Sequence, residues 1–201
     1  MRTSAAMVVR GRVVSGDLVE FGGRGGGIRF EAPDPHQHAA ALPLPDPQGL
    51  ADLHQLRFDD ILDYLEALGQ ALELERNPLL QEALEASCLS SSLTPALLHQ
   101  SYRTLRHLFG RAFAAEMAES TVGVAALEGW VPRTLLDGRR VSVRAFGARA
   151  VHIIAGNSPI IAALSILRNA LTRGDAIIKT PSNDPYTAQA IEPAAVNWTE
   201  I

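Results

Sequence analysis

The sequence predicts an α/β fold built around one strand–helix–strand unit within Val151–Thr187. Two short apolar runs, Val151–Ile154 and Ala176–Ile178, are long enough for buried strands and too short for helices. Between them, from Ile160 to Leu171, apolar residues recur at the spacing of a helix. Because strands joined by a helical crossover run in the same direction, these observations predict a parallel sheet.

Turn residues mark the ends of each element in this unit. Ala155–Pro159 separates the first strand from the helix, with Pro159 at a first helical position, and Gly174 is predicted to end the helix. Lys179–Ser182 ends the second strand. Open parallel sheets bind ligands at the carboxyl ends of their strands, so Ile154–Asn157 and Lys179–Ser182 are predicted to meet at one ligand-binding edge.

The N-terminal part predicts a β structure followed by a proline-rich connector. The runs VVRGRVV, DLVEF and IRFEA predict three short strands joined by tight turns. The run Gly22–Gly27 fits no G-x-G-x-x-G register and no helix pattern follows it, so it is interpreted as a hairpin tip. Glu31–Gly49 predicts an extended connector without helix. His36 and His38 lack a cysteine or a carboxylate cluster to complete a ligand set, so no metal site is predicted.

The middle of the chain predicts helices whose apolar faces are explained by packing. Arg57–Glu75 is amphipathic with carboxylates near its start, where they favour the helix dipole, and Pro78–Ser87 follows. Thr94-Pro95 is predicted to begin one long helix that reaches about Ala118, with the apolar face Leu97, Leu98, Leu105, Leu108, Phe109 and Phe113. Cys88 has no nearby histidine and is interpreted as a structural cysteine.

The chain then enters the predicted sheet through a turn-rich joint, Gly129–Gly138, and a strand, Arg140–Ala145. The arginines of this stretch are interpreted as a solvated edge; they are Arg139, Arg140, Arg144 and Arg149. Three segments result: residues 1–48 as hairpin and connector, 49–128 as a helical region, and 129–201 as the start of an incomplete α/β domain.

Composition limits the classes of function. The chain has 201 residues with 47% hydrophobic content, which suffices for a core, and its net charge of −4 argues against a nucleic-acid partner. The single cysteine excludes a disulfide framework and suits a reducing compartment. No signal peptide is recognisable, and the most apolar helix is shorter than a membrane span of ~20 residues. The prediction is a cytoplasmic protein without a membrane span.

The residues at the two strand ends resemble the start of the cofactor domain of the aldehyde dehydrogenase superfamily, with an Asn-x-Pro turn and a strand that ends in lysine. The stretch GNSPIIAALSILRNALTRGDAIIKTPSNDPYTA is more similar to the long-chain acyl-CoA reductases of bacterial luminescence. That branch has a His-x-x-x-Gly-Asn strand end and a Ser-x-Asp-Pro after the lysine, matched here by His152, Gly156, Asn157, Ser182, Asp184 and Pro185. Leu44–Leu72 resembles the leading helix of the family, and the likeness covers most of Val8–Ala190.

The resemblance implies an aldehyde-dehydrogenase-like fold, namely a partial Rossmann-type parallel sheet preceded by a β-hairpin and a helical N-terminal region. It also implies NADPH-dependent reduction of a long-chain acyl-CoA, or of an acyl-protein thioester, to a fatty aldehyde through a cysteine acyl-enzyme. In this family the cysteine lies well downstream of the lysine strand. The chain is therefore expected to be an N-terminal fragment without the nucleophile, and inactive alone.

The resemblance assigns roles to individual residues. Asn157 matches the asparagine that donates a hydrogen bond to the oxyanion, whereas the residues alone also allow it to cap the following helix. Lys179 matches the lysine that contacts the adenosine ribose, and its alternative is a cation that extends into water. The other residues expected in the cofactor groove are Ile154, Ala155, Gly156, Thr180 and Ser182.

The cofactor preference follows from one departure from the family pattern. Many NAD-preferring members carry a glutamate three residues after the lysine, where this chain has Ser182, with Thr180 nearby. A carboxylate would repel a 2′-phosphate, whereas hydroxyl groups can donate to it. The departure favours NADPH, with NADH as the alternative.

A different class of function stays open at this point. The short chain is also compatible with a non-catalytic binding or assembly module that keeps a vestigial nucleotide-binding motif. Its hairpin and helices would then offer apolar faces to a partner subunit, either a second copy or an acyl-transfer protein.

Overall fold

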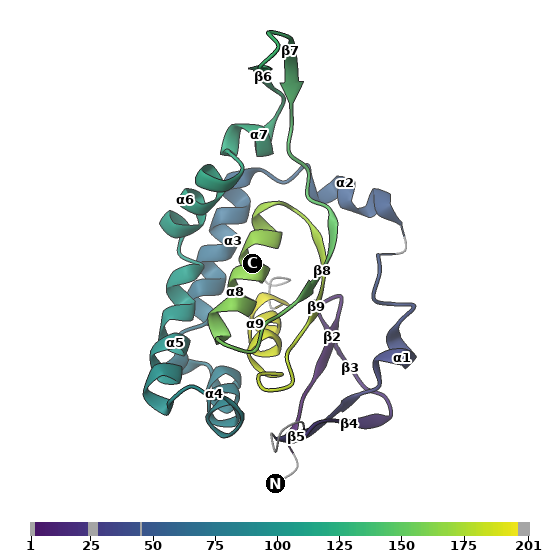
Figure 1. The fold of residues 1–201 in the computed structure, drawn as a ribbon, viewed down its shortest axis with the longest axis vertical. Helices are drawn as coiled ribbons and strands as arrows, with labels where there is room; N and C mark the ends of the chain where they lie inside the picture. The colour runs from purple at the N-terminus through teal and green to yellow at the C-terminus, as the bar shows by residue number, and fades with distance from the viewer. Residues whose placement is uncertain (1–2, 24–27, 45, 197–201) are drawn as a thin grey trace.

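The computed structural model describes residues 3–23, 28–44 and 46–196 and shows a helical layer beside several small sheets (Figure 1). The helical layer contains α3 (Phe58–Ala71), α4 (Pro78–Ser90), α5 (Pro95–Leu108) and α6 (Arg111–Thr121). The strand–helix–strand unit consists of β8 (Arg149–Ile153), α8 (Pro159–Leu171) and β9 (Asp175–Lys179), and α9 (Thr187–Val196) follows it. Helix α8 lies between the helical layer and the β8–β9 pair (Figure 1).

The N-terminal residues form two hairpins instead of the three predicted strands. Strand β2 (Met7–Val9) pairs antiparallel with β3 (Arg12–Val14), so the run VVRGRVV is itself a hairpin. Its turn residues Arg10 and Gly11 both have positive φ, at 52° and 75°, as the tight two-residue hairpin turn requires. Strand β4 (Leu18–Gly22) pairs with β5 (Arg29–Pro33), which also pairs with β1 (Thr3–Ser4). The centre of the predicted glycine-rich tip, residues 24–27, lies outside the described residues.

The connector Glu31–Gly49 contains a short helix, so the prediction that it is extended and without helix is wrong there. Helix α1 (Pro35–His38) begins where the Asp34 side chain accepts a hydrogen bond from the His36 amide at 3.0 Å. This capping contact, with Pro35 in the first helical turn, explains how a proline-rich stretch begins a short helix. A 3₁₀ turn (Pro47–Gly49) and α2 (Leu50–Leu53) follow before α3.

The predicted long helix is divided into α5 and α6. Gly110 is the N-cap residue of α6, and its extended backbone (φ −61°, ψ 138°) interrupts the helical path after Phe109. The remaining short elements of this region are a 3₁₀ turn (Leu74–Arg76) and α7 (Val124–Glu128). Two residues of the predicted apolar face are exposed instead of buried: Leu97 in α5 is 55% exposed and Phe113 in α6 is 39% exposed.

One core joins the helical layer to the strand–helix–strand unit. Its most buried leucines include Leu65, Leu80, Leu98 and Leu105 from the helical layer and Leu167 from α8. Gly69 lets α3 approach α5 closely, since a Cβ atom there would lie 2.8 Å from the Arg106 carbonyl oxygen. The helical layer is therefore the packing surface that holds α8 and α9 in place.

The predicted strand Arg140–Ala145 does not belong to the parallel sheet. Strand β7 (Arg140–Val143) pairs antiparallel with β6 (Val131–Thr134), and this hairpin projects away from the body (Figure 1). Strand β6 occupies part of the predicted turn-rich joint. The polypeptide can form this pair because a turn at Asp137-Gly138, with Gly138 at φ 84°, connects the two strands.

The parallel arrangement of the central unit is confirmed. Strand β8 pairs parallel with β9, with Arg149 opposite Asp175, Val151 opposite Ile177 and Ile153 opposite Lys179. Within the described part of the chain this sheet has two strands, which agrees with the expected partial Rossmann-type sheet.

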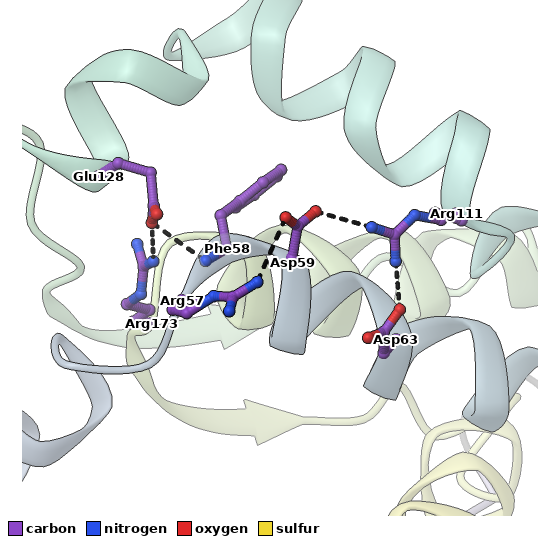
Figure 2. Close-up of polar contacts among 7 residues, drawn as sticks. All are labelled: Arg57, Phe58, Asp59, Asp63, Arg111, Glu128 and Arg173. Carbon is purple, nitrogen blue, oxygen red and sulfur yellow. Dashed lines mark hydrogen bonds and ion pairs between the residues drawn. The ribbon is translucent and has the colours of Figure 1, made fainter.

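The end of α8 differs from the prediction in one residue. Arg173, and not Gly174, takes the left-handed conformation after the helix, with φ 58°. Its buried guanidinium donates to the Leu56 carbonyl at 2.8 Å, to the Leu127 carbonyl at 3.1 Å and to the Glu128 carboxylate at 2.5 Å. These bonds offset the cost of a left-handed non-glycine residue. Figure 2 shows Glu128 also accepting from the Phe58 amide, next to the surface ion pairs of Arg111.

Candidate functional site

The carboxyl ends of β8 and β9 lie side by side, as the sequence predicts. The Ile154 amide donates to the Lys179 carbonyl at 3.0 Å, so the ladder of the two strands continues to the edge itself. From this edge the chain turns into α8 on one side and into the 180–186 loop on the other. The two predicted groups of site residues therefore follow strand ends that are hydrogen-bonded to each other.

Asn157 does not cap α8, so the capping interpretation is wrong. The N-cap residue is Ser158, one position later, and no side-chain cap hydrogen bond is present there. The Asn157 side chain is exposed, and no hydrogen bond to it is found among the described residues. It lies at the positive end of the α8 dipole. A carboxamide in this position can donate to an anion, and the oxyanion role stays a prediction.

The turn before Asn157 is held by the loop that follows β9. Asn183 donates from Nδ2 to the Gly156 carbonyl oxygen at 2.5 Å. A Cβ atom on Gly156 would lie 1.8 Å from Oδ1 of Asn183, so any larger residue would displace this contact. Gly156 thus permits the close contact between the two loops.

Behind this contact a partly buried carboxylate and three buried hydroxyl groups form a chain of hydrogen bonds. Asp184 accepts from the Thr187 amide at 3.1 Å and from the Thr187 hydroxyl at 2.7 Å. The Thr187 hydroxyl lies 2.7 Å from that of Tyr102, which lies 2.9 Å from that of Ser87. Burial raises the pKa of Asp184 and also that of Tyr102. The chain of bonds fastens the loop to α4 and α5.

A groove of about 690 Å³ lies beside β9 and contains half of the predicted cofactor residues. Lys179, Thr180 and Ser182 line its polar end together with Gln189. Its apolar lining comes from the N-terminal hairpins and β9, including Met7, Val8, Val9, Phe21, Phe30, Ile177 and Ile178. Ile154, Ala155, Gly156 and Asn157 are not among the groove residues, so the structure divides the predicted site into a groove part and a turn part.

One ion pair holds the hairpin wall of this groove, and a second one at the same aspartate joins β8 to β9. Arg10, at the β2–β3 turn, donates to Asp175 at the start of β9 at 2.6 Å and to the Leu42 carbonyl at 3.1 Å. Arg149 lies 3.5 Å from the other oxygen of Asp175. The hydrogen bond from Arg10 lowers the pKa of Asp175, and its charge adds to the effect. The wall is therefore anchored at the end of β9 opposite to Lys179.

Lys179 has the charge and exposure that an anion contact needs. Its side chain is exposed at the groove, and no ion pair to it occurs in the part of the chain that the structure describes. The hydroxyl groups of Thr180 and Ser182 lie at the same groove end and add donors. This combination fits a phosphorylated ribose.

Sequence reasoning missed several residues of the site. Asn183, Thr187, Tyr102 and Ser87 were not predicted, although Asp184-Pro185 ahead of a helix is a capping signal that points to the loop. Cys88 is half-buried and packs against the core of the helical region. Its neighbour Ser87 is the α4 residue whose hydroxyl takes part in the network behind the site loops.

The described residues offer neither a cluster of metal ligands nor a membrane-spanning helix. In the described ranges there is no group of three or more histidine, cysteine, aspartate or glutamate side chains that could hold a metal ion. None of the helices that the structure describes is long and apolar enough to cross a membrane.

Comparison with solved structures defines the class of fold. The chain is similar to aldehyde dehydrogenase 21 from Physcomitrella patens, in complex with succinate, with a TM-score of 0.70 at 11% identity over 100% of this chain and 41% of that one. It is similar to 3,6-anhydro-L-galactose dehydrogenase, in complex with the NADP-type ligand NAP, with a TM-score of 0.69 at 12% identity, covering 96% and 39% of the two chains. The fold is that of the aldehyde dehydrogenases, as expected.

Sequence comparison then identifies the family. The acyl-CoA reductase (LuxC) family model matches residues 53–197, so the chain belongs to this family. It is 27% identical over 144 residues to the long-chain acyl-protein thioester reductase of Photorhabdus laumondii, covering 69% of this chain and 28% of that protein. It is 24% identical over 142 residues to the protein of the same description in Vibrio harveyi, covering 69% and 29%. The chain thus spans under a third of the length of these relatives.

Proposed function

We propose that this chain supplies the oxyanion donor and part of the cofactor groove of a reductase that converts a long-chain acyl-CoA to a fatty aldehyde with NADPH. The observation that carries the proposal is that the turn with Asn157 and the loop after Lys179 leave the same sheet edge, where the Ile154 amide donates to the Lys179 carbonyl. The family supports an acyl thioester as substrate. The names of the relatives make an acyl-protein thioester the alternative donor.

The proposed reaction proceeds in two steps through a cysteine that lies outside this chain. The cysteine thiolate attacks the thioester carbonyl, and the CoA thiolate leaves. Hydride addition to the resulting acyl-enzyme then gives a second tetrahedral oxyanion, which collapses to the aldehyde and returns the thiolate. The balance is one thioester, one NADPH and one proton consumed for one aldehyde, one thiol and one NADP⁺ formed. Asn157 would stabilise both oxyanions from the start of α8.

NADPH, when bound, would supply the hydride. Lys179 would contact the adenosine ribose and its 2′-phosphate, and the hydroxyl groups of Thr180 and Ser182 would donate to the same phosphate. The apolar lining of the groove suits the adenine ring. Ile154, Ala155 and Gly156 would lie along the cofactor towards Asn157. NADH remains the alternative because the same residues also suit unphosphorylated ribose.

We also propose that the chain is divided into the segments 1–48, 49–128 and 129–201, with the last as the start of the cofactor-binding domain. An acyl-transfer protein or a second copy of the chain is the proposed protein partner. The competing function, a non-catalytic assembly module, predicts no specific binding of nucleotide at the Lys179 edge.

The test is NADPH oxidation with a long-chain acyl-CoA by a protein that joins this chain to the downstream part its relatives carry. Replacing Asn157 by alanine should lower kcat about 10²–10³-fold, the usual effect of losing one oxyanion donor. Lys179→Ala should raise KM for NADPH and leave KM for the thioester unchanged. The chain alone should show no turnover. Turnover by the chain alone that disappears in Cys88→Ala would instead make Cys88 the nucleophile.

A further inference from the structure

The two ends of α8 carry the same kind of contact, an asparagine amide that binds a glycine carbonyl. At the carboxyl end Asn169 donates from Nδ2 to the Gly174 carbonyl at 2.8 Å, and at the amino end Asn183 donates to the Gly156 carbonyl at 2.5 Å. Neither glycine has room for a Cβ atom against its asparagine. The two contacts differ in their neighbours, because only the Asn183–Gly156 contact lies directly before Asn157.

The Gly156 carbonyl controls the position of Asn157 through covalent geometry. This carbonyl and the Asn157 amide belong to one planar peptide unit, so a bond to the oxygen fixes the orientation of the whole plane. Glycine otherwise allows more backbone conformations than any other residue. The Asn183 contact thus restrains the backbone before Asn157 from outside the turn, and the Asn157 side chain has no hydrogen bond of its own within the described residues.

Asn183 is itself held firmly. The adjacent Asp184 accepts from the Thr187 amide and hydroxyl, and the Thr187 hydroxyl continues to Tyr102 and Ser87. Tyr102 and Thr187 are both 0% exposed. The Asp184 amide also donates to the Pro181 carbonyl at 3.2 Å, which closes the turn that contains Asn183. The loop is therefore attached to the helical layer through contacts that water does not reach.

We propose that Asn183 is a positioning residue for Asn157, and that the chain Asp184–Thr187–Tyr102–Ser87 transmits this restraint from α4 and α5. The inference rests on the proposed oxyanion role of Asn157. Asn183 acts through the Gly156 peptide and does not touch the reacting atoms. The helical layer thereby contributes to the oxyanion site without lining it.

The expected effect is on the chemical step. Asn183→Ala should lower kcat about 10-fold, less than Asn157→Ala, because the donor remains but its orientation is no longer fixed. KM for NADPH should stay within about 2-fold, since Asn183→Ala leaves the side chains of Lys179, Thr180 and Ser182 in the groove unchanged. In a background that already carries Asn157→Ala, the same substitution should change kcat by less than about 2-fold, because there is no donor left to position.

Asn169→Ala is the matched control. It removes the equivalent asparagine–glycine contact at the other end of the same helix and should lower the midpoint of thermal unfolding by a similar amount, with kcat unchanged. In this chain alone, labelled with ¹⁵N, Asn183→Ala should also broaden or shift the Asn157 amide resonances, and Asn169→Ala should not. A loss of stability alone would act on both variants equally.

Three results separate the possible failures. Equal kcat for Asn183→Ala and Asn169→Ala, with Asn157→Ala still impaired, would overturn the positioning role and leave the proposed function standing. A 10-fold loss that persists in the Asn157→Ala background would also overturn it, because Asn183 would then act by another route. Normal kcat in Asn157→Ala itself would remove the proposed function, and the inference with it.

Discussion

At its amino end β9 is fixed by charged side chains that bind other segments, whereas after its carboxyl end the chain is fixed by buried hydroxyl groups next to a partly buried carboxylate. Arg173 and Asp175 make the first set of contacts, to α7 and the segment before α3 and to Arg10. Asp184 and Thr187 make the second set, with Tyr102 and Ser87. Both sets hold the same strand.

The difference lies in what each set leaves free. At the amino end the charged groups themselves make the stabilising contacts, and each is bound to a carbonyl or an opposite charge. At the carboxyl end the hydrogen-bonded groups that hold the chain lie behind the loops, while Asn157, Lys179 and Ser182 remain exposed. The comparison supports the proposal that one end of the strand mainly stabilises the fold and the other carries the site, in line with ligand binding at the carboxyl edge of open α/β sheets.

The largest expected effect on stability is that of Arg173→Ala. The substitution leaves the Leu56 and Leu127 carbonyls without their donor and Glu128 without its ion pair, so we expect a loss of about 3 kcal/mol in the free energy of unfolding. Urea unfolding followed by circular dichroism measures it. Arg173→Lys keeps the charge without the planar donor group and should recover only part of the loss. A loss under about 0.5 kcal/mol would contradict the view that the amino end is the stabilising end.

A smaller effect is expected from Tyr102→Phe, which removes the hydroxyl that joins Ser87 to Thr187. The ring still fills its place, so the loss should be about 1–2 kcal/mol, because two buried hydrogen bonds are lost while Thr187 keeps its bond to Asp184. Because the network supports the Gly156–Asn183 contact, the Asn157 amide resonances should also shift. Unchanged resonances would mean that the network stabilises the loop without transmitting a restraint to the site.

The two aspartates should give opposite dependences of stability on pH. Burial raises the pKa of Asp184 above its ordinary value of 3.8, so its contribution is present below that value and is lost as the pH rises through the raised pKa. The Arg10 contact lowers the pKa of Asp175, so its contribution is present above 3.8 and is lost as the pH falls through the lowered pKa. Unfolding free energies measured across pH should lose the first dependence in Asp184→Asn and the second in Asp175→Asn. If both variants changed the unfolding free energy in the same direction with pH, the contrast between the two environments would be contradicted.

The smallest effect is expected at the surface ion pairs of Arg111 with Asp59 and Asp63, seen in Figure 2. All three side chains are substantially exposed, so water screens the charges, and Arg111→Ala should cost at most about 1 kcal/mol. The same unfolding measurement in raised salt should reduce even this difference. A cost comparable to that of Arg173→Ala would show that exposure is a poor guide to which arginine matters.

The sequence predicted the features that depend on neighbouring residues. The β8–α8–β9 unit was predicted because apolar spacing and turn residues are local signals, and the position of Asn157 and Lys179 at one edge follows from parallel pairing. The β2–β3 hairpin was missed because Arg10-Gly11 interrupts two runs that together look like one alternating strand. The division at Gly110 was missed because the apolar spacing continues beyond it into α6.

The missing part of the site depends on residues far apart in the chain. Tyr102 and Thr187 are separated by 85 positions, and Arg10 and Asp175 by 165. Neither partner shows a local pattern that points to the other. Only the packing of α5 against α8 and of α4 against α9, together with the contact of the hairpin with α9, brings these pairs together.

The most direct test of a site at the carboxyl edge is a titration of the ¹⁵N-labelled chain with NADPH, followed by the shifts of its amide resonances. We predict weak binding whose shifts are confined to Ile154–Asn157, to Lys179–Ser182 and to the residues that line the groove. Lys179→Ala should abolish these shifts, and Asn169→Ala should leave them unchanged. Shifts that survive in Lys179→Ala, or that gather around Arg173 and Asp175 instead, would contradict the assignment of the site to the carboxyl end of the strands.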